Sequence, residues 1–122
     1  MLIVQDCIEY MQTRNDESFD LIIADPPYFG IYGDFDFVWD DVSHYISWSK
    51  KWIAECNRLL KHDGSFYLWG KIGFGKGYAL FQIADWIERE SLFKVQNWIT
   101  QRNSRGRGNK KGYMEAREEL VL

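Results

Sequence analysis

Residues 25–28, with the sequence Asp-Pro-Pro-Tyr, carry the clearest chemical signal in this chain. They contain the only two prolines of the 122 residues, placed between a carboxylate and an aromatic ring. Proline has no N–H and a fixed φ, so a Pro-Pro pair forms a stiff backbone that offers only carbonyl acceptors. An acidic acceptor, an acceptor-only backbone and a flat stacking face together suit a planar base that carries an exocyclic NH2 group.

Hydrogen bonds from the amino group of such a base to these residues would activate it. The exocyclic nitrogen of adenine is a weak nucleophile because its lone pair is delocalised into the ring. When its two N–H groups donate hydrogen bonds to two acceptors, the nitrogen becomes more pyramidal and its lone pair is freer. The Asp25 carboxylate and the Pro26 carbonyl are the natural candidates for these acceptors. Tyr28 would stack on the base and Phe29 would add apolar surface, once the base has flipped out of a duplex. The alternative is that Asp25 only caps a turn.

The surrounding sequence alternates between predicted strands and helices. The patterns predict strands over residues 2–4, 19–24, 65–69, 94–100 and 118–122, and helices over residues 6–13, 43–60 and 78–89, the second with Ser43 as a candidate cap. Residues 19–24 are apolar without alternation, which is typical of a buried parallel strand. We therefore expect an α/β fold with right-handed crossovers and a parallel sheet covered on both faces.

Polar residues follow several of the predicted strands. Ligands bind parallel sheets beyond the carboxyl ends of the strands. Asp6, Asp25 and the glycine-rich residues 70–77 each come directly after a predicted strand. The order of elements thus predicts that these three groups meet at one edge of the sheet.

Composition excludes several classes of protein. With 46% apolar residues, a chain of this length can form one globular domain with a core. No apolar run approaches the roughly 20 residues that span a bilayer, and no secretory signal is visible, so we expect no membrane contact and a cytoplasmic location. The two cysteines form no disulfide framework, and no Cys/His cluster indicates a metal.

Positive charge is concentrated near the end of the chain, although the net charge is −3. Five cations stand between residues 101 and 111 without an acid: Arg102, Arg105, Arg107, Lys110 and Lys111. Because the stretch follows a predicted strand on the same side as Asp25, we expect it to contact nucleic-acid phosphates and to be weakly ordered without them. The alternative is an ordinary solvated surface.

The chain resembles the amino-directed, S-adenosylmethionine-dependent DNA methyltransferases, which methylate adenine N6 or cytosine N4. The first basis is the Asp-Pro-Pro-Tyr motif after an apolar strand, and the resemblance extends over nearly the full chain. Further matching segments are residues 4–7, 18–22 and 39–40, residues 52–53 with Glu55, residues 58–61 and 64–65, residues 97–99 and 101–102, and residues 118–121. The resemblance implies a Rossmann-like methyltransferase sheet flanked by helices.

Residue roles follow from the same resemblance. It implies a partial methyltransferase catalytic domain over residues 1–122, with a basic, glycine-rich loop over residues 101–117, and DNA as the partner. It assigns catalysis to Asp25, Pro26, Pro27 and Tyr28, contact with the substrate base to Tyr28 and Phe29, and binding of the cofactor S-adenosyl-L-methionine to Asp6, Cys7 and Asp25. On the alternative interpretation, Asp6 is only a helix N-cap and Cys7 only a small buried side chain.

One feature of the family is not found before Leu122. The family binds its cofactor with a Phe-x-Gly-x-Gly loop, which in the subgroup resembled here lies near the C-terminus. Residues 73–77 look superficially similar, but they follow the strand after the catalytic one, which favours a plain connection. We therefore expect an incomplete sheet that lacks its cofactor-loop strand, with an exposed edge or face that allows self-association.

Three functions remain open at this level. The first is the catalytic segment of an adenine-N6 enzyme from a restriction-modification system, because Asp at the first motif position is typical of the adenine enzymes in the family. The second is methyl transfer to another amino group, in cytosine N4, an RNA base or a protein glutamine. The third is an inactive remnant that only binds nucleic acid.

Overall fold

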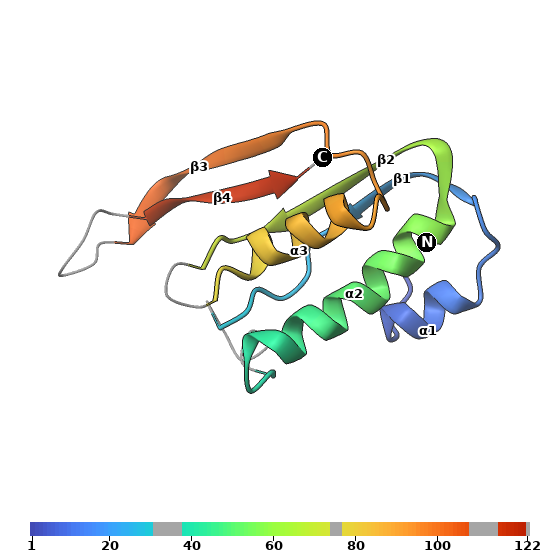
Figure 1. The fold of residues 1–122 in the computed structure, drawn as a ribbon, viewed down its shortest axis with the longest axis horizontal. Coiled ribbons are helices and arrows are strands. Elements are labelled where there is room, and N and C mark those ends of the chain that lie inside the picture. The colour runs from blue at the N-terminus through green and yellow to red at the C-terminus, as the bar shows by residue number, and fades with distance from the viewer. Residues whose placement is uncertain (31–37, 74–76, 108–114, 122) are drawn as a thin grey trace.

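The computed structural model of the protein describes residues 1–30, 38–73, 77–107 and 115–121. Within these ranges, a four-stranded sheet forms one layer and the helices form another (Figure 1). The strands are β1 (Phe19–Ala24), β2 (Leu60–Gly70), β3 (Trp98–Arg107) and β4 (Glu115–Val121), and the helices are α1 (Cys7–Gln12), α2 (Val42–Leu59) and α3 (Ala79–Arg89). The predicted α/β class is thereby confirmed.

The strands do not all run in the predicted direction. Their order in the sheet is β1-β2-β4-β3. β1 and β2 pair in parallel as predicted, but β4 is antiparallel to both β2 and β3, so the prediction of a wholly parallel sheet is wrong. β3 and β4 are close in sequence and pair as neighbours, which antiparallel strands do without a crossover helix. Because β4 runs opposite to both neighbours, β1, β2 and β3 all point the same way.

Among the described residues the sheet is covered on one face, not on both as predicted. Ile22 and Ala24 of β1 pack against the helices, whereas Leu21 and Ile23 are 51% and 63% exposed on the other face. Side chains alternate between the faces of a strand, so a strand with helices on one side only is half buried. The expected self-association through the exposed face stays a prediction.

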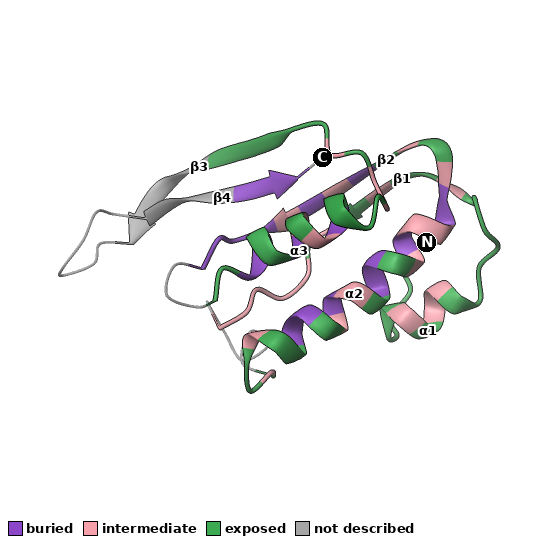
Figure 2. Cartoon of the chain, in the orientation of Figure 1, coloured by how far each residue is buried: buried purple, intermediate pink, exposed green. Residues whose placement is uncertain are grey.

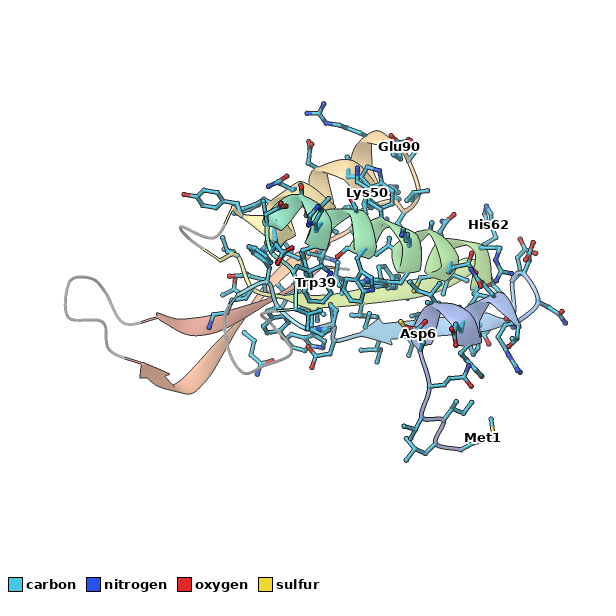
Figure 3. The ribbon with its side chains drawn as sticks, turned by 90° about the horizontal axis from the view of Figure 1, so that it is seen from below. Met1, Asp6, Trp39, Lys50, His62 and Glu90 are labelled. Carbon is cyan, nitrogen blue, oxygen red and sulfur yellow. The ribbon has the colours of Figure 1, made fainter. Side chains whose placement is uncertain are left out.

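Residues 2–4 form no strand, contrary to the prediction. Leu2 and Val4 are 88% and 90% exposed, and Met1 lies well away from the body of the molecule (Figure 3). A strand needs a partner for its backbone hydrogen bonds, and the edge strand β1 is paired only with β2 among the described residues. Strand propensity alone therefore does not order this segment.

Helix α2 supplies most of the core. Its buried residues recur every three or four positions and face the sheet (Figure 2): Tyr45, Ile46, Ser49, Trp52, Ile53, Cys56 and Leu59. The cap is Asp41 and not Ser43, because one Asp41 carboxylate oxygen accepts from the backbone N–H groups of Ser43 and His44 at 2.7 and 3.0 Å. Hydrogen bonds from the Ser43 hydroxyl and the His44 amide lower the pKa of Asp41. No helix in the described ranges is both long and apolar enough to cross a membrane.

Strand β2 begins earlier than the predicted residue 65. Residues 62–64, which follow the helix predicted over residues 43–60, lie inside the strand. A Cβ at Gly64 would stand 2.9 Å from the Asp20 carbonyl oxygen and 2.8 Å from Leu60, so only glycine allows β1 and β2 to approach here. The pairing shifts register at this point, between Phe19 and Leu21. Gly64 therefore allows the close approach of two strands and does not end a helix.

The basic segment is more regular than the predicted loop over residues 101–117. β3 continues through Arg107 and β4 begins at Glu115, so both ends of the segment belong to strands. Arg102 of β3 pairs with Arg117 of β4. Residues 108–114, which include Lys110 and Lys111, lie outside the described residues. Cross-strand pairing overrides the low strand propensity of this glycine-rich sequence.

Helix α1 is held against the end of α2 by Arg58. The Arg58 guanidinium donates to the carbonyl oxygens of Met11 at 2.9 Å and Arg14 at 3.0 Å. It also donates to the Glu55 carboxylate at 2.7 Å. Met11 lies in the last turn of α1 and Arg14 follows that helix, so the two bonds to their carbonyls tie the C-terminal end of α1 to α2. The clamp thereby fixes the short helix that carries Cys7 and is capped by Asp6.

The two cysteines should differ in reactivity. Cys7 is exposed, contrary to the prediction that it is buried, and Cys56 is 3% exposed. Burial, together with the nearby Cys7 and Glu55, raises the pKa of Cys56 to about 12. The thiolate is the nucleophile, so native iodoacetamide treatment followed by peptide mass spectrometry should label Cys7 and leave Cys56 intact until the chain is denatured. Equal labelling of both in the folded chain would contradict this packing.

Candidate active site

The Asp-Pro-Pro-Tyr segment lies at the carboxyl edge of the sheet. β1 ends at Ala24, directly before Asp25, and Ala24 pairs with Leu68 near the end of β2. The chain after β2 leaves the sheet at the same edge, next to the segment after β1 (Figure 1). Asp25 and the start of the glycine-rich connection therefore meet as predicted, whereas Asp6, the third group of that prediction, follows no strand. Residues 74–76 of that connection lie outside the described part of the chain.

The Asp25 carboxylate is accessible and is partly engaged by Tyr28. The Tyr28 hydroxyl donates to Oδ1 of Asp25 at 2.9 Å. Asp25 is exposed, whereas Tyr28 is half-buried. Among the described residues no hydrogen bond reaches Oδ2 of Asp25. One carboxylate oxygen is therefore fixed by the motif's own tyrosine, and the other is open to a ligand.

The two proline carbonyls differ in their partners. The Tyr45 hydroxyl, from the first turns of α2, donates to the Pro27 carbonyl oxygen at 2.9 Å. Within the described residues no donor reaches the carbonyl oxygen of Pro26. The acceptors that remain for a ligand are thus Oδ2 of Asp25 and the carbonyl of Pro26, the pair that the sequence indicated.

An aromatic cluster surrounds Tyr45 and supports the segment from beneath. The centroid of the Tyr45 ring lies 5.7 Å from that of Phe29, 5.0 Å from that of Trp39 and 5.8 Å from that of Trp48. The contact with Trp39 is edge-to-face, a favoured aromatic arrangement. Phe29 therefore packs into this cluster beside the helix, which restricts the apolar surface that it offers to a base.

A narrow crevice runs behind the segment. Pro26, Tyr28 and Tyr45 line one side of it, and residues 68–73 line the other. Its volume is about 10 Å³, which is roughly the room for one water molecule. A planar base does not fit inside it. Any base bound by Asp25 must lie on the solvent side of the segment, where the Asp25 carboxylate is exposed.

Asp6 has a defined structural role. Its Oδ1 accepts from the backbone N–H groups of Ile8 at 2.9 Å and Glu9 at 3.0 Å, so it is the N-cap of α1. The residue is exposed and stands at the start of α1, where Figure 3 labels it. Cys7 follows it, with a pKa raised first by burial and then by the Asp6 charge. A cofactor contact for these two residues stays a prediction.

The basic residues of β3 lie beyond the catalytic edge. Trp98 pairs with Val121, which pairs with Leu68, so Trp98 is level with Ala24 across the sheet. Each further residue of β3 advances about 3.3 Å. Arg102, Arg105 and Arg107 therefore stand on the part of the hairpin that projects past the end of β2, as Figure 1 shows. Their backbone lies on the Asp25 side of the molecule, as expected.

Two features of the site were not apparent from the sequence. Tyr45 was missed, although a tyrosine on a buried helix stripe needs a partner for its hydroxyl, and this signal could have identified it. Glu119 was also missed: it is 2% exposed and accepts from the Trp98 indole and the Thr100 hydroxyl, each at 2.7 Å. This cross-strand network ties β3 to β4 at the base of the projecting hairpin.

Metal ligands are not clustered in the part of the chain that the structure describes. No group of three or more His, Cys, Asp or Glu residues lies together there. The described residues at this edge offer two open hydrogen-bond acceptors, Oδ2 of Asp25 and the carbonyl of Pro26.

Comparison with known proteins identifies relatives of the chain. A family model named N6_N4_Mtase and described as DNA methylase matches residues 19–122. The Type II methyltransferase M.HinfI of Haemophilus influenzae is 33% identical over 109 residues, which cover 75% of this chain and 30% of that protein. The Type II methyltransferase M.HpaI of Haemophilus parainfluenzae is 28% identical over 123 residues, covering 99% of this chain and 37% of that protein.

Solved structures share the fold. The PvuII DNA methyltransferase, described as cytosine-N4-specific, superposes with a TM-score of 0.77 at 17% identity, covering 97% of this chain and 46% of that one. The complex of M1.HpyAVI with SAM superposes with a TM-score of 0.59 at 22% identity, covering 96% and 50%. The chain thus spans about a third of the length of these curated relatives and about half of these structures.

Proposed function

The chain belongs to the DNA methylase family, and we therefore propose that it is the catalytic segment of a DNA adenine-N6 methyltransferase. The observation that carries the proposal is the pair of acceptors left open at the carboxyl edge, Oδ2 of Asp25 and the carbonyl of Pro26. An amino group on a planar base has two N–H donors, which match this pair. Adenine is favoured over cytosine because Asp stands at the first position of the motif.

The acceptors act on the electron pair of the amino nitrogen. Hydrogen bonds to Asp25 and Pro26 favour a pyramidal nitrogen whose lone pair is less delocalised into the ring. The Tyr28 ring stacks on the base and sets its plane. Extrusion of the base from a duplex costs a few kcal/mol, and stacking contributes about 1–3 kcal/mol, which offsets much of that cost. The main task of these residues is placement of the nitrogen for in-line attack.

S-adenosylmethionine is the proposed methyl donor. When bound, it supplies a methyl group on a positively charged sulfur. The described residues fit one side of such a cofactor, because Asp6 and Asp25 are both exposed carboxylates and each is hydrogen-bonded through only one of its oxygens among those residues. Asp6 would accept from donors of the cofactor with its second oxygen while Oδ1 caps α1. Asp25 would contact the cofactor beside the base.

Phosphate contacts by the projecting hairpin complete the proposal. Arg102, Arg105 and Arg107 lie past the end of β2 on the Asp25 side of the molecule. Cations there hold the DNA backbone while the base reaches Asp25. DNA is thus the proposed partner. The proposed location of the protein is the cytoplasm.

Expression of the complete gene in a bacterial host without DNA methylases tests the function. Chromosomal DNA is hydrolysed to nucleosides and analysed by mass spectrometry, with an empty vector as control. We expect N6-methyldeoxyadenosine, because the open acceptors receive the adenine amino group. N4-methyldeoxycytidine instead would replace adenine by cytosine as the target. Absence of both products from cells that contain folded protein would favour an inactive nucleic-acid-binding remnant.

A further inference from the structure

We propose that Tyr45 is a positioning residue, which fixes the Asp-Pro-Pro-Tyr segment so that the Pro26 carbonyl, and not that of Pro27, receives the amino group. Tyr45 lies on α2, eighteen residues from Pro27 in sequence, and donates to its carbonyl oxygen at 2.9 Å. The chemical meaning of this positioning rests on the proposed function. The hydrogen bond itself does not.

Backbone restrictions within the Pro26-Pro27 pair leave one rotation to be fixed. Proline rings set φ at both Pro26 and Pro27. A following proline restricts ψ of the residue before it, so ψ of Asp25 and ψ of Pro26 are limited as well. ψ of Pro27 has no such restriction, because Tyr28 follows it. This rotation orients the Pro27 carbonyl and decides where the Tyr28 ring is placed.

Prolines offer no N–H through which such a segment can be anchored. A carbonyl is the only backbone group of Pro27 that can form a hydrogen bond. The Tyr45 hydroxyl binds this group, and the bond therefore acts on the one rotation that the prolines leave free. Fixing a carbonyl direction from outside the segment requires a donor on a rigid element.

Tyr45 meets that requirement. It is 4% exposed, and its ring packs against Phe29, Trp39 and Trp48. The first turn of its helix is fixed by the Asp41 cap. The hydroxyl is therefore presented at a constant position relative to β1, whose end the segment continues.

Two tyrosine hydroxyls each occupy one acceptor of the segment and leave the others open. With Pro27 fixed, Tyr28 is placed so that its hydroxyl donates to Oδ1 of Asp25 at 2.9 Å. Tyr45 occupies the carbonyl of Pro27. Oδ2 of Asp25 and the carbonyl of Pro26 stay available. These are two acceptors, and one amino group has two N–H donors.

The first test measures the position of the segment in the 122-residue chain. Tyr45→Phe removes the hydroxyl and keeps the packed ring. NMR should show shifted or broadened signals for the Pro27 carbonyl carbon, the Tyr28 amide and the Asp25 carboxyl carbon. Tyr10→Phe is the matched control, because no hydrogen bond of the Tyr10 hydroxyl is present among the described residues. Unchanged Tyr28 and Asp25 signals in Tyr45→Phe would overturn the proposal.

The second test uses donor rescue in the complete gene product. We expect Tyr45→Phe to lower kcat at least about 10-fold with KM for DNA within about twofold, since placement and not DNA affinity is lost. Replacing Tyr45 by 4-aminophenylalanine restores an N–H donor and should recover most of kcat, whereas 4-methoxyphenylalanine, which has no donor, should not. Equal kcat values for the two replacements would overturn the proposal even if Tyr45→Phe destabilises the protein.

Failure of the proposed function is distinguishable from failure of this inference. A wild-type protein that methylates no base would refute the function, while the NMR comparison would still decide whether Tyr45 fixes Pro27 and Tyr28. A wild-type protein that methylates adenine, with a Tyr45→Phe variant of unchanged kcat and unchanged Tyr28 signals, would refute the positioning role alone.

Discussion

Asp25→Ala in the complete gene product is expected to lower methyl transfer to DNA about 10²- to 10³-fold, the range found when one preorganised hydrogen-bonding group is removed from an active site. The loss follows from the geometry: Oδ2 of Asp25 is one of the two open acceptors, and without it the amino nitrogen keeps its delocalised lone pair. Tyr28 also loses its hydrogen bond to Oδ1 of Asp25. Radiolabelled methyl transfer under single-turnover conditions measures the effect.

Matched controls separate chemistry from folding. Asp25 is exposed, so the Ala variant should keep the thermal unfolding midpoint of the wild type within a few degrees. Asp25→Asn keeps one oxygen acceptor and should lose less activity than Asp25→Ala. DNA affinity should be nearly unchanged in both variants. Full activity of a folded Ala variant would remove Asp25 from the mechanism.

Replacing the three arginines of β3 by glutamine should weaken DNA binding and flatten its dependence on salt. Each phosphate contact contributes about 0.9 to the slope of log K against log salt concentration, so loss of all three contacts should reduce the slope by about 2.7. The arginines are Arg102, Arg105 and Arg107, on the hairpin that projects past the catalytic edge. Adding the changes Lys110→Gln and Lys111→Gln should reduce the slope further. Fluorescence anisotropy with a duplex at several salt concentrations measures both quantities.

A charge-matched control excludes an effect of net charge alone. Lys51, Arg89 and Lys94 are exposed and stand outside the β3 hairpin, so their replacement by glutamine removes the same charge elsewhere. The control variant should keep the salt slope of the wild type. Equal slopes for the hairpin variant and the control would leave the β3 arginines as ordinary surface.

Local sequence patterns were sufficient to predict many of the helices and strands. The bounds of β1 and α2 were predicted at nearly their observed positions, because each depends on a pattern within one segment. Asp6 as a cap of α1 and the approach of residues 70–73 to the Asp25 segment were also accessible from residue order. Such features depend on neighbours in sequence.

Other features depended on partners far away in the chain. Residues 2–4 have strand propensity, but no described strand pairs with them. The basic segment has loop composition, yet β4 pairs with it and extends β3 to Arg107. Asp41 and Ser43 are both good N-caps by type, and the path of the preceding loop decided between them. Propensity indicates which local structures a segment can form, and contacts with distant parts of the chain decide which of them it adopts.

The sequence by itself determined which chemical groups are available: a carboxylate, two proline carbonyls and a phenol ring, joined in one stiff segment at the end of a strand. The tertiary structure alone decided which of their acceptors stay open. A hydrogen bond from Tyr45, on a helix that packs against the sheet, occupies the Pro27 carbonyl and leaves that of Pro26. Covalent order fixes the identity and stiffness of neighbouring groups, whereas the direction of a carbonyl is set by packing between elements that are distant in sequence.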